Sequence, residues 1–145
     1  MPTARTLLIL ALSAVPAFAA DLSSPVGEWR TIDDATGAAR ALVRIYQHDG
    51  ALFGLVEQPL AKDGHPNCDA CTDDRRGKPI VGMDIIRGLQ ADGDHWDGGT
   101  ILDPENGKVY RCTLTLRDGG QHLAVRGYIG ISLFGRSQTW VRKQP

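Results

Sequence analysis

The sequence lacks most of the features that indicate a specific biochemical activity. It has no glycine-rich phosphate-binding loop, no residue in the surroundings of an activated nucleophile, and no complete set of metal ligands at a recognised spacing. It also has no run of lysine and arginine, and its 16 basic side chains nearly balance 17 acidic ones. This balance favours neither nucleic acid nor an anionic membrane surface as a partner. We therefore expect no cofactor, no bound metal and no nucleic-acid partner.

Long hydrophobic runs are absent except at the N-terminus. Residues 7–15 are apolar apart from one serine, follow Arg5 and precede the small-residue sequence Ala17-Phe18-Ala19. This combination is typical of a secretory signal peptide, and the run is too short to span a bilayer. The sequence thus predicts a signal peptide over residues 1–19 and an exported, periplasmic or extracellular, product of residues 20–145. With Arg5 removed, that product has 15 basic and 17 acidic side chains, a net charge of −2.

Segments that could form helices are also scarce. The chain has 17 glycines, and each glycine in a helix interior costs about 1 kcal/mol. Short alternating segments separated by turns such as Asp49-Gly50 instead indicate β-strands. Eight strands are predicted, at residues 27–31, 42–47, 51–57, 83–89, 95–103, 108–116, 122–129 and 136–142.

Short connections between these segments favour pairing of consecutive strands. Residues 108–116 place Tyr110, Cys112, Leu114 and Leu116 on an apolar face and mostly polar side chains on the other, as in the wall of a small barrel. Closing the sheet would also remove exposed edges. The predicted fold class is a single all-β domain over residues 20–145, an antiparallel up-and-down barrel of about eight strands.

The only long irregular segment, residues 59–79, contains two of the three cysteines. In an oxidising compartment, Cys68 and Cys71 are close enough to form a disulfide that pins a loop. A redox-active pair, free thiols, and thiols that bind a metal together with His65 are the alternatives. We expect the two loop cysteines to be exposed on a mobile rim. Cys112 lies on an apolar strand face, which favours a buried free thiol.

A small set of large side chains remains as tentative ligand contacts. Aromatic residues in a small barrel more often fill its core or cap its ends than contact a ligand. Arg126 would need an anionic or hydrogen-bonding partner if it faced inward, but the apolar residues Leu123, Val125 and Ile129 favour the register that places it outside. The tentative ligand-binding residues are Trp96, Tyr110, Arg126, Tyr128 and Trp140.

Two resemblances bear on the fold. Gly27-Glu28-Trp29 near the start and Arg142 near the end resemble the barrel-closing device of lipocalins, in which a first-strand tryptophan packs beneath a basic side chain. The whole pattern resembles the exported bacterial family named domain of unknown function 2147. The motifs that carry it are Cys68-x-x-Cys71, Lys78-Pro79-Ile80-Val81-Gly82, Trp96-x-Gly98-Gly99-x-Ile101-x-Asp103-Pro104, Arg126-Gly127-Tyr128 and Gly135-Arg136-x-Gln138-x-Trp140. The resemblance implies a small lipocalin-like barrel, with Trp29 and Arg142 in structural roles, and supplies no reaction.

Three functions are compatible with these features. The leading hypothesis is a non-enzymatic barrel that binds a small, partly apolar molecule, with its mouth near residues 59–79. The second is a structural or envelope-interaction protein whose barrel is filled. The third is a thiol-dependent enzyme that uses Cys68 and Cys71.

Export gives the first prediction. Because Ala17 and Ala19 occupy the small-residue positions of a signal peptidase site, we expect cleavage after Ala19. Intact-mass spectrometry of protein from an extracytoplasmic fraction should give a chain that begins at Ala20. A mass that retains Met1 to Ala19 would contradict it.

Overall fold

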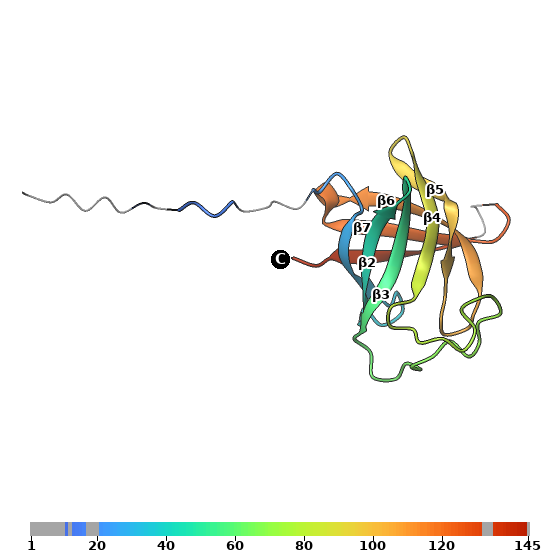
Figure 1. Ribbon diagram of the computed structural model, residues 1–145. Helices are drawn as coiled ribbons and strands as arrows, with labels where there is room; N and C mark the ends of the chain where they lie inside the picture. The colour runs from blue at the N-terminus through green and yellow to red at the C-terminus, as the bar shows by residue number, and fades with distance from the viewer. Residues whose placement is uncertain (1–10, 12, 17–20, 132–134, 145) are drawn as a thin grey trace, which may run out of the picture.

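The computed structural model describes residues 11, 13–16, 21–131 and 135–144, and its strands form one closed barrel (Figure 1). Each strand pairs antiparallel with the next, and the last pairs with the first. This confirms the predicted all-β up-and-down barrel. The strands are β1 (Gly27–Ile32), β2 (Ala39–His48), β3 (Ala51–Pro59), β4 (Asp84–Asp92), β5 (His95–Leu102), β6 (Val109–Arg117), β7 (His122–Tyr128) and β8 (Gly135–Arg142).

Little of the chain outside these strands is regular. A short 3-10 turn, η1 (Asp118–Gly120), joins β6 to β7. No helix in the described part of the chain has the length and apolar character needed to cross a membrane. The predicted signal peptide, residues 1–19, lies largely outside the described residues, so its cleavage stays a prediction.

The strands form where the sequence alternates between apolar and polar residues. In β6, Cys112 and Leu114 are buried while Val109 and Arg111 are exposed, as the alternation predicts. The hairpin between β2 and β3 turns at Asp49 and Gly50, which both have positive φ. β2 begins at Ala39, three residues before the predicted start, because alanine and arginine carry little strand signal of their own.

The two ends of the barrel differ in how the strands connect. At one end lie the short β2–β3, β4–β5 and β6–β7 turns, together with residues 21–26 of the N-terminal segment. The other end carries the β1–β2 and β5–β6 turns, the β7–β8 connection and the long β3–β4 loop, residues 60–83. Figure 1 shows this green loop crossing the end opposite the yellow β4–β5 hairpin.

The barrel closes at a contact between its first and last strands. Trp29 of β1 pairs in register with Arg142 of β8, and both side chains are buried. The Arg142 guanidinium carbon lies 4.3 Å from the centre of the Trp29 ring, which is cation–π geometry. The indole nitrogen of Trp29 donates a hydrogen bond of 2.8 Å to the carbonyl of Pro25. This is the contact between strand ends expected from the sequence.

Arg142 also holds the N-terminal segment and the β6–β7 turn in place. Its guanidinium donates hydrogen bonds to three carbonyl oxygens, those of Gly120 at 2.7 Å, Val26 at 3.2 Å and Ser24 at 2.8 Å. A β-carbon at Gly27 would lie 2.9 Å from an Arg142 nitrogen, so glycine leaves the space that the guanidinium occupies. Arg142 thereby fastens the N-terminal segment and the β6–β7 turn to this end of the barrel.

The closure predicts an order of stability losses. Trp29→Ala removes a fully buried ring and the cation–π contact, and should lower the free energy of unfolding by about 3–5 kcal/mol. Arg142→Ala keeps the ring but leaves buried carbonyls without donors, and should cost about 1–3 kcal/mol. Denaturant melts of the two variants measure the difference.

Arg30→Ala is the control for these melts, since Arg30 is the exposed neighbour of Trp29 in β1. Its substitution should change stability by less than about 0.5 kcal/mol. Equal, negligible losses for Trp29→Ala and Arg142→Ala would show that the strand ends do not depend on this contact.

Candidate functional site

The barrel encloses a cavity of about 440 Å³ that opens at the end opposite Arg142. Its rim is formed by the β1–β2 turn, the β5–β6 turn and the ends of β7 and β8. The volume falls within the range of ligand pockets in proteins. The residues that line it include Thr31, Ala41, Ile85, Ile101, Leu102, Tyr110, Val125, Gly127, Tyr128, Ile129, Gln138 and Trp140.

The wall of the cavity is apolar apart from a few uncharged polar groups. Gln138 precedes Trp140 by two residues in β8, so both side chains face inward. The Trp140 indole nitrogen donates a hydrogen bond of 3.2 Å to the Gln138 side-chain oxygen. Tyr110 lies beside Gly127, where an added β-carbon would be 3.4 Å from the Tyr110 β-carbon. The absence of a side chain at Gly127 therefore helps to keep this part of the barrel open.

Charged side chains are confined to the rim, where ion pairs and turns hold them. Arg40 forms ion pairs with Asp63 at 3.0 Å and with Glu105. Arg136 donates to Asp34 through its Nε at 2.8 Å. These bonds lower the pKa of the Asp34 carboxyl below its ordinary value, chiefly through Arg136.

Two further rim carboxylates organise turns. Asp33 accepts from the amides of Ala35 and Thr36 in the β1–β2 turn, and these bonds lower its pKa. Asp103 accepts from the amide of Glu105 in the β5–β6 turn at 2.9 Å. Hydrogen bonds from backbone amides to an aspartate carboxylate, as at Asp33 and Asp103, are expected at the start of a turn.

The structure brings together three of the five tentative ligand-binding residues. Tyr110, Tyr128 and Trp140 line the cavity. Trp96 instead packs partly buried against the core from β5, and does not reach the cavity. Arg126 lies outside, because Leu123 and Val125 are the inward residues of β7, and it hydrogen-bonds to Ser137 of β8 at 3.0 Å.

Sequence reasoning missed several residues of the cavity wall. Gln138 is separated from Trp140 by one residue, so strand alternation could have identified it. Thr31 follows Trp29 by the same spacing. Gly127 gave no such signal, because the effect of a missing side chain depends on Tyr110 and Ile101, which come from other strands.

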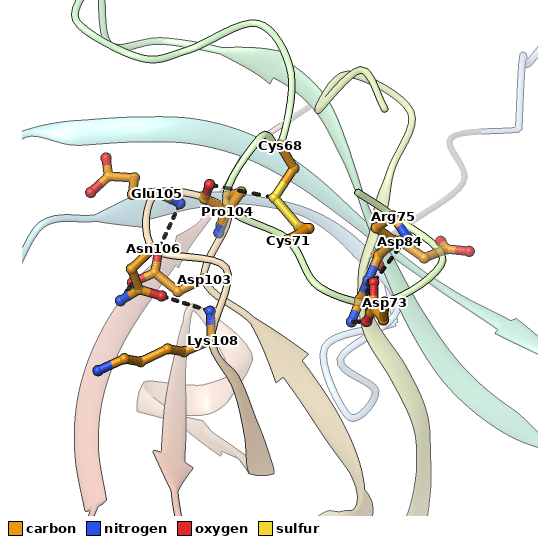
Figure 2. Close-up of a disulfide and its surroundings, with 10 residues drawn as sticks. All are labelled: Cys68, Cys71, Asp73, Arg75, Asp84, Asp103, Pro104, Glu105, Asn106 and Lys108. Carbon is orange, nitrogen blue, oxygen red and sulfur yellow. Dashed lines mark hydrogen bonds and ion pairs between the residues drawn. A yellow bond between two sulfur atoms is a disulfide. The ribbon is translucent and has the colours of Figure 1, made fainter. Parts of the chain in front are cut away.

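The β3–β4 loop braces the rim and does not itself line the cavity. The expected disulfide joins Cys68 and Cys71, whose Cα atoms are 5.4 Å apart. Cys68 Sγ lies 3.6 Å from the Pro104 carbonyl oxygen, so the disulfide rests against the β5–β6 turn (Figure 2). A β-carbon at Gly107 would overlap the Ala70 carbonyl, which explains why the turn ends in glycine.

The packing of this loop corrects one expectation. The two cysteines were expected to be exposed on a mobile rim. Both are buried, with relative exposures of 0% for Cys68 and 1% for Cys71. Backbone hydrogen bonds also tie the loop to itself, from Cys68 to Lys78 at 2.9 Å and from Gly77 to Cys68 at 2.8 Å. The loop is thus a packed element.

Arg75 is a second anchor of the loop (Figure 2). Its side chain is buried, donates to the Asp84 carbonyl at the start of β4 at 2.8 Å, and pairs with Asp73 at 2.6 Å. The guanidinium lowers the pKa of the Asp73 carboxyl to about 2. Outside the barrel, Arg87 pairs with Asp74 at 2.8 Å beside a shallow surface hollow of about 330 Å³.

The three cysteines supply no reactive thiolate in this oxidation state. Cys68 and Cys71 are bonded to each other, which also removes them as metal ligands with His65. Cys112 is free and buried, and burial raises the pKa of its thiol to about 12. A thiolate is the reactive form, so Cys112 is inert at neutral pH.

One group of potential metal ligands does converge among the described residues. Asp92, His95 and Asp97 lie at the β4–β5 hairpin, where their ligand atoms come within 4.8 Å of one another. The His95 imidazole also contacts Asp94 at 3.0 Å, and this bond with the other carboxylates raises its pKa. The group is partly exposed and lies at the end of the barrel away from the cavity, so it takes no part in the candidate site.

The cysteine arrangement predicts a pattern of thiol labelling. Native protein should take up no iodoacetamide at neutral pH, because all three sulfur atoms are bonded or buried. Denatured, non-reduced protein should be labelled once, at Cys112. Denatured and reduced protein should be labelled at all three cysteines. Peptide mass mapping checks each state, and labelling of Cys68 or Cys71 before reduction would contradict the disulfide.

Comparisons with known proteins agree with this architecture. The model of the family described as "Uncharacterized protein conserved in bacteria (DUF2147)" matches residues 27–142. No curated protein matches the sequence. A solved structure, that of protein HP1028 from the human pathogen Helicobacter pylori, described as belonging to the lipocalin family, superposes with a TM-score of 0.72 and 15% identity. The alignment covers 83% of this chain and 84% of that chain, and at this identity it shows a shared fold.

The family match extends from the first residue of β1 to the last residue of β8. It therefore includes the whole barrel, the disulfide loop and every residue that lines the cavity. The chain belongs to the bacterial family DUF2147, and its fold is a lipocalin-like barrel.

Proposed function

We propose that the protein binds one small, partly apolar molecule in the cavity of its barrel. The observation that carries this proposal is the cavity of about 440 Å³, sealed at one end by Arg142 and Trp29 and open at the other. Its apolar wall with a few uncharged polar groups is the usual composition of a small-molecule site.

The geometry favours binding over a purely structural role. A barrel that served only as a scaffold would be expected to fill its interior, because an empty volume forfeits packing contacts. Here two small residues, Ala41 of β2 and Gly127 of β7, line the cavity. The likeness to a protein described as a lipocalin supports the same interpretation by analogy of fold.

Export is part of the proposal. The signal-like N-terminus supports it, as does a disulfide, which persists in oxidising compartments. The first contacts of the folded domain come from residues just after the expected cleavage site. Asp21 caps its own turn with a hydrogen bond from Ser23, and Ser24 binds Arg142.

A cavity-filling variant tests the proposal. The neutral, apolar dye N-phenyl-naphthylamine should bind native protein with one dye per barrel and gain fluorescence. Gly127→Val would place two methyl groups in the cavity at a position where a β-carbon makes ordinary contacts. It should weaken dye binding by about tenfold or more, as a change of one or two methylenes does in an apolar pocket.

Ala124→Val is the matched control, because Ala124 lies on the outer face of the same strand. This variant should bind the dye like the native protein, and thermal melts should show that both variants fold. Absence of dye binding, or equal affinity in Gly127→Val, would contradict ligand binding in the barrel.

A further inference from the structure

We propose that the ligand carries no negative charge, and that the site selects neutral molecules over carboxylates and other anions. The inference rests on the proposed function and deepens it, since it concerns the chemical class of ligand held in the same cavity. It depends on where the charges of the site lie and on which of them are already paired.

The interior offers no cation to an anionic ligand. Among the described lining residues, the charged ones lie at the rim, in turns or near strand ends, and the polar ones deeper in the barrel, Thr31, Tyr110 and Gln138, are uncharged. Arg142 is the charged group nearest the closed end, but its guanidinium stacks on Trp29 and donates to three carbonyls. With a relative exposure of 4%, it is sealed behind the ring and has no face left for a ligand.

The rim is negative. Five carboxylates lie on it or pair with its arginines, against two guanidiniums and the ammonium of Lys108 in the β5–β6 turn, which does not line the cavity, so the net charge is −2. Both arginines are taken, since Arg40 binds two carboxylates and Arg136 binds one. The carboxylates are Asp33, Asp34, Asp63, Asp103 and Glu105.

Binding of an anion is therefore unfavourable both inside the cavity and at its rim. Inside the cavity it would lose its hydration without gaining a charged partner, which is costly. At the rim it would have to displace a carboxylate from Arg40 or Arg136 within a negative field. A neutral ligand meets neither penalty.

The wall can instead orient a neutral polar group. Because the Gln138 side-chain oxygen accepts from the Trp140 indole, the orientation of the amide is fixed. Its Nε2 group is then a donor on that wall, and Tyr110, which carries a hydroxyl, also lines the cavity. An alcohol, amide or carbonyl group on an apolar body fits these partners.

A matched pair of ligands tests the inference on the native protein. Octanol and octanoate have the same chain and differ in charge at pH 8. Each is titrated against protein loaded with N-phenyl-naphthylamine. Octanol should displace the dye at a concentration roughly tenfold or more below that needed for octanoate, because only octanoate must bury an unpaired charge.

A second measurement adds the missing cation. Gln138→Arg places a guanidinium on the cavity wall and should increase the affinity for octanoate relative to octanol by roughly tenfold, provided that a thermal melt shows a folded domain. Octanoate that binds the native protein as tightly as octanol, or gains nothing in folded Gln138→Arg, would overturn the inference. In that case the proposed function would still hold if dye binding is weakened by Gly127→Val. If the dye and both ligands fail to bind, the proposed function itself is contradicted.

Discussion

The barrel depends on the charge of Arg142, which is buried where the two ends of the sheet meet. The seam between β1 and β8 has two residue pairs in register, whereas β7 and β8 share seven. So short a seam is reinforced from both sides, since Arg142 stacks on Trp29 while Lys143 pairs with Glu28 at 2.9 Å. Burial lowers the pKa of Arg142 from its ordinary value, and three carbonyls and an aromatic face compensate for its lost hydration.

Arg142 and Trp29 close one end of the barrel, and the cavity opens at the other end. Among the residues that the structure describes, the open end has no comparable plug, and the β3–β4 loop supports it from outside. The disulfide supports the β5–β6 turn at Pro104, Arg75 fastens the loop to β4, and Arg40 bridges Asp63 of the loop to Glu105 of the turn. Arg40 thereby both braces the rim and has its positive charge paired with two carboxylates.

The contact of Trp29 with Arg142 was implied by the resemblance to lipocalins, whereas local patterns in the sequence predicted the strands and their order. These features depend on alternation and on turn residues such as Asp49 and Gly50, which act within a few positions. The cavity could not be predicted in the same way, because its volume depends on side chains of different sizes that meet across the barrel. Burial of Cys68 and Cys71 was missed because a polar, glycine-rich loop carries no sign of the surface on which it packs.

The pairing of β1 with β8 also determines when the molecule can finish folding. These strands come from opposite ends of the domain, so their contact closes a loop of nearly its whole length. The entropy of that closure is lost before the seam contributes any stability, which makes such a topology slow and cooperative to form. A chain that stops short of Arg142 has neither the guanidinium nor the seam. The residues of β8 that pair with β1 therefore control the final step of barrel closure.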